Sequence, residues 1–262
     1  MTRPQAPATD ARQEALYGFP YHYLVDFDAA SGGGFRAGRW YAGGLRYAAY
    51  MLHVERSLAR EAFGSIVDVG CGDGWLASRL ATRFPERRVV GVDVSPSGLK
   101  LASSMHAAPN LEFQSCDITR ASPSGSPFDC GTLVEVLEHV PVAEVPAFVE
   151  AVGRLIRPGG KLFVTVPSTN LDVRRIERHH QHFTDETLQA ALAPCFEVEL
   201  CQYVNRKGRG DRWLRQLVTN SVFALTHERT LDLLFRQYMR HLFFADRKTG
   251  LRVFGIFRRK SR

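Results

Sequence analysis

The fold of this 262-residue chain is decided by the stretch Val67-Asp68-Val69-Gly70-Cys71-Gly72-Asp73-Gly74. A short apolar run at residues 65–69 leads into this stretch, and apolar residues at helical spacing follow it from Trp75 to Phe84. The glycines allow a tight turn and let the backbone approach a ligand closely. The sequence therefore predicts a buried strand, a glycine-rich binding turn and a helix.

The alternation of short apolar runs with helical-period segments continues toward the C-terminus. It is typical of a parallel sheet with helices on both faces. Strands are predicted at residues 65–69, 88–94, 111–116, 128–134, 161–166, 196–204 and 251–257, and helices begin near residues 75, 96, 145 and 185. We expect an α/β fold with a doubly wound, Rossmann-like sheet of seven mostly parallel strands and an antiparallel last strand.

The chain is expected to divide into five regions around this core. An N-terminal tail (1–14) precedes an aromatic, glycine-rich segment (15–63), whose composition suits a helical lid that closes over ligands, or packed edge residues. The core then spans 64–205. A basic helical insertion (206–250) precedes the last strand and a basic tail (251–262).

Positive charge is concentrated in the C-terminal part of the chain. The formal net charge is +7, and residues 205–262 hold fifteen Lys and Arg against four Asp and Glu, so the rest of the chain is mildly acidic. A basic segment attracts nucleic acid, anionic lipid or phosphorylated substrates, or it is simply a solvated surface. Two amphipathic stripes between Asp211 and Asp246 predict helices that cover the site, form a dimer contact, lie on a membrane surface or pack against the sheet.

The composition also narrows the protein class. No apolar run approaches the length of a membrane span, and the first residues, Met1 to Arg12, are polar instead of signal-like. The five cysteines are widely spaced and form no Cys-x-x-Cys pair. These features predict a cytoplasmic protein with reduced thiols.

An acidic residue after the second strand points to an adenosine-containing cofactor. Asp93 follows Gly74 by nineteen residues, where a carboxylate can accept hydrogen bonds from both ribose hydroxyls. A dinucleotide motif would need a third glycine where Trp75 stands, and Asp68 and Asp73 would repel a pyrophosphate. A sulfonium cofactor avoids this conflict, so the charge pattern favours S-adenosylmethionine over NAD.

Four motifs in this order resemble those of class I S-adenosylmethionine-dependent methyltransferases. They are the glycine turn, Asp93, the segment Ser115-Cys116-Asp117-Ile118 and the segment Leu155-Ile156-Arg157-Pro158-Gly159-Gly160-Lys161-Leu162. The resemblance runs from about residue 66 to residue 166. It implies that the cofactor is bound by Asp68, Gly70, Cys71, Gly72, Asp93, Val94, Asp117, Ile118, Val134 and Glu135.

The catalytic candidates follow the fourth and fifth strands. Glu135, Glu138 and His139 share one face if their turn is helical, and a histidine-rich loop (residues 178–182) enters from the next connection. The segment 134–140 is similar to ubiquinone-biosynthesis O-methyltransferases and to small-RNA 2′-O-methyltransferases. The latter resemblance implies Mg²⁺ or another divalent metal on Glu135, Glu138, His139 and His182. Without a metal, His139 or His182 is the expected general base, with Glu138 beside it.

Three functions remain open from the sequence. The first is O-methylation of a small-molecule or glycolipid-type acceptor. The second is a metal-assisted RNA 2′-O-methyltransferase, for which the basic C-terminal segment would bind nucleic acid. The third is a non-catalytic methyltransferase-fold subunit that binds a partner through the insertion.

Overall fold

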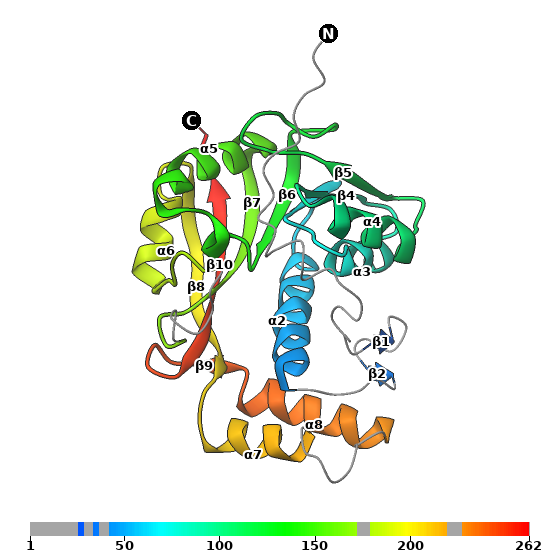
Figure 1. The fold of residues 1–262 in the computed structure, drawn as a ribbon, viewed down its shortest axis with the longest axis vertical. Coiled ribbons are helices and arrows are strands. Elements are labelled where there is room, and N and C mark those ends of the chain that lie inside the picture. The colour runs from blue at the N-terminus through cyan, green and yellow to red at the C-terminus, as the bar shows by residue number, and fades with distance from the viewer. Residues whose placement is uncertain (1–25, 29–33, 37–41, 172–178, 219–226, 262) are drawn as a thin grey trace.

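The computed structural model describes residues 26–28, 34–36, 42–171, 179–218 and 227–261. Its centre is a mixed sheet of eight strands in the order β5-β4-β3-β6-β7-β10-β8-β9 (Figure 1). The doubly wound α/β fold with mostly parallel strands and a late antiparallel strand is thereby confirmed. The eighth strand, β9 (Phe244–Ala245), has only two residues and was not predicted.

The parallel half of the sheet agrees closely with the sequence. It consists of β3 (Ser65–Val69), β4 (Arg88–Asp93), β5 (Leu111–Ser115) and β6 (Phe128–Val134), followed by β7. The central strands β3, β4 and β6 are buried almost throughout. Strands covered on both faces read as continuous apolar runs, which explains why their bounds could be predicted.

Strand β7 (Ile156–Pro167) begins five residues earlier than predicted. Ile156 pairs with Phe128, the register then shifts, and Lys161 pairs with Cys130. The predicted turn at residues 157–160 therefore lies inside the strand as a bulge, where Gly159 takes a φ of 74°. A sequence typical of a turn forms a bulge within a strand when pairing with the neighbouring strand resumes after it.

Strand β10 (Gly250–Arg259) lies between β7 and β8 (Phe196–Arg206) and is antiparallel to both. Two layers of helices cover the sheet. Helices α2 (Ala42–Leu58) and α3 (Trp75–Arg83) belong to one buried cluster, and α5 (Val145–Leu155) and α6 (Asp185–Leu192) belong to the other. Helix α4 (Pro96–Met105) connects β4 to β5.

The segment predicted as a lid contains a core helix. Residues Leu45, Ala48, Ala49 and Leu52 of α2 are at most 2% exposed, so this helix is a fixed part of the domain. A small hairpin of β1 (Asp26–Asp28) and β2 (Gly34–Arg36) precedes it. The remaining residues of the predicted tail and lid lie outside the described part of the chain.

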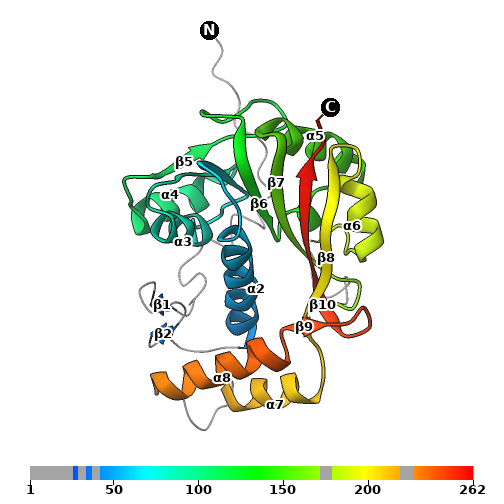
Figure 2. The same ribbon diagram turned by 180° about the vertical axis from the view of Figure 1, so that it is seen from behind.

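The basic insertion forms the expected pair of helices, α7 (Arg209–Val218) and α8 (Glu228–His241). Figures 1 and 2 show them side by side across the end of α2, away from α5. Leu214, Phe235 and Tyr238 are buried in the cluster that contains α2. The stripes therefore pack at the base of α2 instead of lying on a face of the sheet.

Two expectations about composition can be compared with the structure. All five cysteines are free. Among the described residues, no helix has the length and apolar character needed to cross a membrane.

Candidate functional site

The glycine turn joins β3 to α3 in a conformation that requires glycine. Gly70, Gly72 and Gly74 have φ values of 72°, 55° and 77°. A Cβ on Gly70 would lie 2.5 Å from Cγ2 of Val136, and one on Gly74 would lie 2.5 Å from Cζ of Phe113. Both the backbone and the neighbouring side chains therefore exclude larger residues at Gly70 and Gly74.

Asp93 is held beside this turn by backbone amides. Gly72 N donates to Oδ2 of Asp93 at 2.8 Å, and Ser95 N donates to Oδ1 at 2.8 Å. The side chain is buried, so its orientation is fixed. Because each carboxylate oxygen accepts more than one hydrogen bond, this group can also receive the two hydroxyls of a ribose.

Two further carboxylates make the turn electronegative. Asp68 is buried and accepts a 2.7 Å hydrogen bond from Oγ1 of Thr132. Burial raises the pKa of Asp68 to about 7, and the charges of Asp93 and Asp73 add to this shift. Burial also raises the pKa of Asp73. These carboxyl groups fit a cofactor with a sulfonium and an ammonium group, and they would repel a pyrophosphate.

The segment after β5 begins beside Asp93. Cys116 N donates to Asp93 O at 3.1 Å. Asp117 Oδ1 accepts hydrogen bonds from Thr119 N at 3.0 Å and from its hydroxyl at 2.6 Å. Ile118 is buried, whereas Val94 at the end of β4 is 37% exposed. A polar side chain and two apolar ones are thus available for an adenine ring.

Glu135 follows the buried end of β6, Val134, in a left-handed conformation with a φ of 55°. Its amide donates to Thr165 O at 2.9 Å, and its carboxylate accepts from the Thr165 hydroxyl at 3.2 Å and from Arg252 Nε at 2.8 Å. The side chain is therefore engaged by β7 and β10. Non-glycine residues with a positive φ are uncommon in proteins as a whole, and those that occur are often found at functional sites.

Glu138 lies in a short 3₁₀ turn, η2 (Leu137–His139), at 1% exposure. Neither carboxylate oxygen has a hydrogen-bond partner among the described residues. Burial raises the pKa of Glu138 well above its usual value, and the charge of Glu135 raises it further. A buried carboxyl group without partners is costly unless it is protonated or meets a cation.

Three side chains converge at Glu138. Ligand atoms of Glu138, His139 and His179 all lie within 4.8 Å of one another. His182 lies behind them, with its Nε2 2.7 Å from Nδ1 of His179 and its Nδ1 3.1 Å from Leu171 O. The group thus contains two of the four residues expected as metal ligands, and His182 contacts it through His179.

The difference from the expected set has a local cause. The expectation required a helical turn over residues 135–139, but the turn starts at Leu137 and Glu135 precedes it in a left-handed conformation. Glu135 therefore pairs with Arg252. His179 could not be chosen over His182 from the sequence, because both belong to the same histidine-rich loop.

Tyr50 and Arg252 were not singled out from the sequence. The Arg252 guanidinium lies 5.0 Å from the Tyr50 ring centroid. The Tyr50 hydroxyl is buried and has no hydrogen-bond partner within the described segments. Burial and the charge of Glu135 raise its pKa well above the usual value. An arginine inside the apolar run of β10 was the one available sequence signal for this contact.

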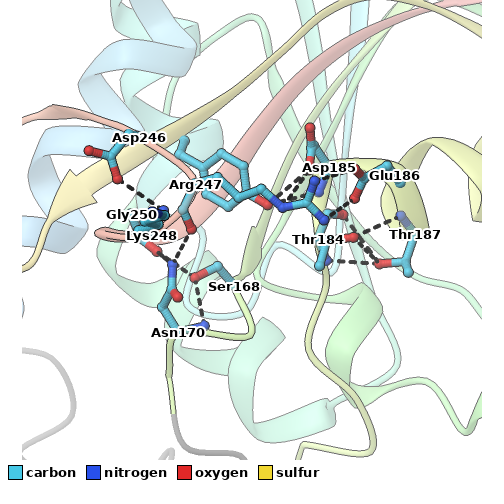
Figure 3. A network of polar contacts seen from close by, with 11 residues as sticks. Ser168, Asn170, Thr184, Asp185, Glu186, Thr187, Asp246, Arg247, Lys248 and Gly250 are labelled. Atoms are coloured by element: carbon cyan, nitrogen blue, oxygen red, sulfur yellow. Dashed lines mark hydrogen bonds and ion pairs between the residues drawn. The ribbon is translucent and has the colours of Figure 1, made fainter.

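A polar network fixes both ends of the loop that carries the histidines (Figure 3). Ser168 Oγ and Asn170 Nδ2 each donate to Gly250 O at 2.6 Å. At the other end, Arg247 pairs with Glu186 of α6. Residues 172–178 of the loop lie outside the described part, but both bases of the loop are attached to the turn before β10.

Comparison with known proteins agrees with this geometry. A methyltransferase domain matches residues 66–160. The ubiquinone biosynthesis O-methyltransferase of Alkalilimnicola ehrlichii is 29% identical over 84% of this chain and 87% of that relative. The enzyme of the same name from Idiomarina loihiensis is 35% identical, but that match covers only 40% of this chain and 43% of the relative.

Among solved structures, the N-methyltransferase NodS from Bradyrhizobium japonicum, in complex with S-adenosyl-L-homocysteine, has a TM-score of 0.56. It is 16% identical and covers 82% of this chain and 87% of that one. The strand order and the glycine turn thus define a Rossmann-like methyltransferase fold. This fold and the matched domain support a class I S-adenosylmethionine-dependent methyltransferase.

Proposed function

We propose that this protein binds S-adenosylmethionine at the β3–α3 turn and transfers its methyl group to an oxygen atom of a small molecule. The observation that carries the proposal is the arrangement of Gly72, Asp93 and Ser95, in which two backbone amides orient a buried carboxylate toward a glycine turn. The relatives named as ubiquinone biosynthesis O-methyltransferases support an oxygen acceptor.

The cofactor supplies a methyl group on a positively charged sulfur. The acceptor oxygen would attack the methyl carbon in line, and the sulfur would leave on the opposite side. Asp93 would accept hydrogen bonds from the ribose, and Asp117, Ile118 and Val94 would hold the adenine. Gly70, Cys71 and Gly72 would lie against the methionine part, whose positive charge would favour the ionised form of the buried Asp68 carboxyl group. Val134 and Glu135 close the site at the end of β6.

The protein's chemical task is to align the acceptor and to take its proton. His139 is the proposed base, since an imidazole can take a proton near neutral pH and His139 ends η2, the first turn after β6. Glu138 and His182 complete the proposed catalytic group, and His182 acts through its 2.7 Å contact with His179. The oxygen–methyl bond forms as the sulfur–methyl bond breaks, and the acceptor proton moves to the imidazole.

A divalent metal is a second proposal at the same place. Its support is the buried Glu138 carboxylate, which has no partner among the described residues, beside ligand atoms of His139 and His179. One carboxylate and two imidazoles suit Mn²⁺, Fe²⁺ or Zn²⁺ better than Mg²⁺, which prefers oxygen ligands. A bound ion would hold the acceptor oxygen and lower its pKa. Glu135 is bound to Arg252 and is not included in this revised set.

Calorimetric titration with S-adenosylmethionine tests the first proposal. We expect saturable heat from the folded protein, and S-adenosylhomocysteine should form when catechol is added as a hydroxyl probe. Lack of heat from protein with an intact circular dichroism spectrum would refute cofactor binding. Binding without turnover on any hydroxyl probe would favour the alternative of a non-catalytic binding subunit.

Metal removal tests the second proposal. Dialysis against EDTA should abolish turnover, and Mn²⁺ or Zn²⁺ should restore it, while S-adenosylmethionine binding stays unchanged. The variant His179→Ala should lose metal binding as measured by equilibrium dialysis, whereas His180→Ala, an exposed neighbour, should not. EDTA-resistant turnover would leave the histidines as metal-free bases. Methylation of short RNA would favour the RNA enzyme alternative.

A further inference from the structure

The insertion of α7 and α8 presents two different sides. On the inner side, Leu214, Leu231 and Phe235 are buried with α2, and Asp211 pairs with Arg46, whose Nη2 lies 2.5 Å from Asp211 Oδ1. The Asp211 side chain of this ion pair is only 2% exposed. The helices are thus fixed to the domain by their inner side, and the opposite side faces outward.

The outer side combines large apolar groups with arginines. Trp213 is 61% exposed and Leu233 is 52% exposed, although both belong to residue types that are normally covered. Five arginines of the same two helices are exposed as well: Arg209, Arg212, Arg229, Arg236 and Arg240. The acidic side chain of Asp232 on α8 forms an ion pair with Arg236, one turn further along the helix.

This combination matches the chemistry of a lipid headgroup layer. An indole ring is amphipathic and is enriched at membrane interfaces, and leucine inserts at the acyl boundary. Arginines beside them are attracted to anionic phospholipids. A purely solvated basic face would explain the arginines but not the two exposed apolar side chains.

The outer side of α7 and α8 lies beyond the end of the sheet that carries the site residues. Strand β10 runs away from α7 and α8 in Figure 1, and β7 is antiparallel to β10, so β7 and the parallel strands run toward the insertion. The site residues that follow β3, β4 and β6 therefore lie at the end of the sheet that faces α2 and the insertion. A protein docked by this surface would turn that end toward the bilayer.

We propose that the outer side of α7 and α8 docks on a bilayer that contains anionic phospholipids. The charge complementarity carries this choice, because α7 and α8 carry six arginines against three acidic residues, and Asp211, one of the three, pairs inward with Arg46. Docking of this kind is peripheral and reversible, since it uses interfacial helices without a membrane span. It does not depend on methyl transfer.

Vesicle sedimentation tests this proposal with the full chain. The protein should sediment with vesicles of phosphatidylcholine containing phosphatidylglycerol and remain in solution with pure phosphatidylcholine, and added salt should weaken the binding. The double variant Arg212→Glu/Arg240→Glu should bind at least about thirtyfold more weakly, since each basic residue near an anionic surface contributes measurably. Trp213→Phe should abolish the vesicle-induced blue shift of tryptophan emission.

The matched control is Arg87→Glu/Lys100→Glu, which makes the same charge change at exposed positions outside the insertion. It should sediment like the wild type. Equal losses in both double variants would overturn the proposal, because they would indicate a net-charge effect alone. Failure of the wild type to sediment, or tighter binding to a short RNA than to the anionic vesicles, would overturn it as well.

Discussion

Asp93 contacts the glycine turn directly at the scale of single residues, and in the proposed function it also binds the ribose of the cofactor. The variant Asp93→Ala loses the hydrogen bonds from Gly72 and Ser95 together with those of the ribose. Charge-assisted hydrogen bonds contribute about 1.5–3 kcal/mol, so affinity for S-adenosylmethionine should fall about 10- to 100-fold in calorimetry. Glu112→Gln, an exposed change on the adjacent strand β5, should bind like the wild type.

Asp68 should make stability depend on pH. Its pKa is raised from 3.8 to about 7, so the folded state binds more protons than the unfolded state between these values. Stability from this group is therefore present at low pH and is lost as the pH rises toward 7. Urea unfolding should show that Asp68→Asn gains stability over the wild type across this range, by about 2–4 kcal/mol at pH 8.

A carboxylate with the opposite shift provides the control for that experiment. The Arg157 guanidinium and backbone amides lower the pKa of Asp129, although partial burial opposes them. Asp129→Asn should therefore be less stable than the wild type above pH 4, with the difference vanishing as the pH falls. If both variants changed stability in the same direction, the buried position of Asp68 would not be the cause.

The sequence predicted the geometry of the glycine turn better than that of the histidine group. Gly70, Gly72 and Asp93 belong to a local pattern in which backbone sterics and strand ends determine the geometry. The histidine group depends on the backbone of a single residue, Glu135, whose left-handed conformation cannot be read from an apolar pattern.

Helix α6 offers a test at the scale of an element. Thr184 Oγ1 accepts from Thr187 N at 3.2 Å, and the Thr187 hydroxyl accepts from Thr184 N at 2.8 Å, which forms a reciprocal cap. Thr184→Ala should lower the free energy of unfolding by about 1 kcal/mol in thermal or urea melts. Thr82→Ala, in the exposed last turn of α3, should change it by less than about 0.5 kcal/mol.

The strands β3 and β6, which are buried almost throughout, were predictable, whereas the two-residue edge strand β9 was not. The bounds of β3 and β6 agree with the apolar runs because both strands must be apolar along their whole length. Strand β9 pairs only with β8, and two residues carry no periodicity. The bulge in β7 was misread for a different reason, because its register shift depends on pairing with β6 and not on local sequence.

The attachment of the insertion is a property of the whole molecule. Arg46 and Asp211 are 165 residues apart, and their ion pair joins α2 to α7. Removing one partner of a nearly buried pair leaves an uncompensated charge, so Asp211→Asn should lower the free energy of unfolding by about 2–3 kcal/mol. Limited proteolysis should then cut α7 and α8 faster.

The exposed pair of Asp232 and Arg236 supplies the comparison. Asp232→Asn should change stability by less than about 0.5 kcal/mol, because surface pairs contribute little. Equal proteolysis of the two variants would show that the Arg46 contact does not hold the insertion. Amphipathic stripes predicted these helices, but the stripes could not predict their neighbour, which depends on a contact distant in sequence.

The position of β10 has a consequence for synthesis on the ribosome. Both of its neighbours in the sheet, β7 and β8, are translated earlier. The insertion lies between β8 and β10 in the chain and delays β10 further. Until residues 250–259 emerge, two long strands present unpaired backbone groups, a state that promotes association between nascent chains. Expression at low temperature with chaperones should therefore improve recovery most for variants that weaken the pairing of this strand.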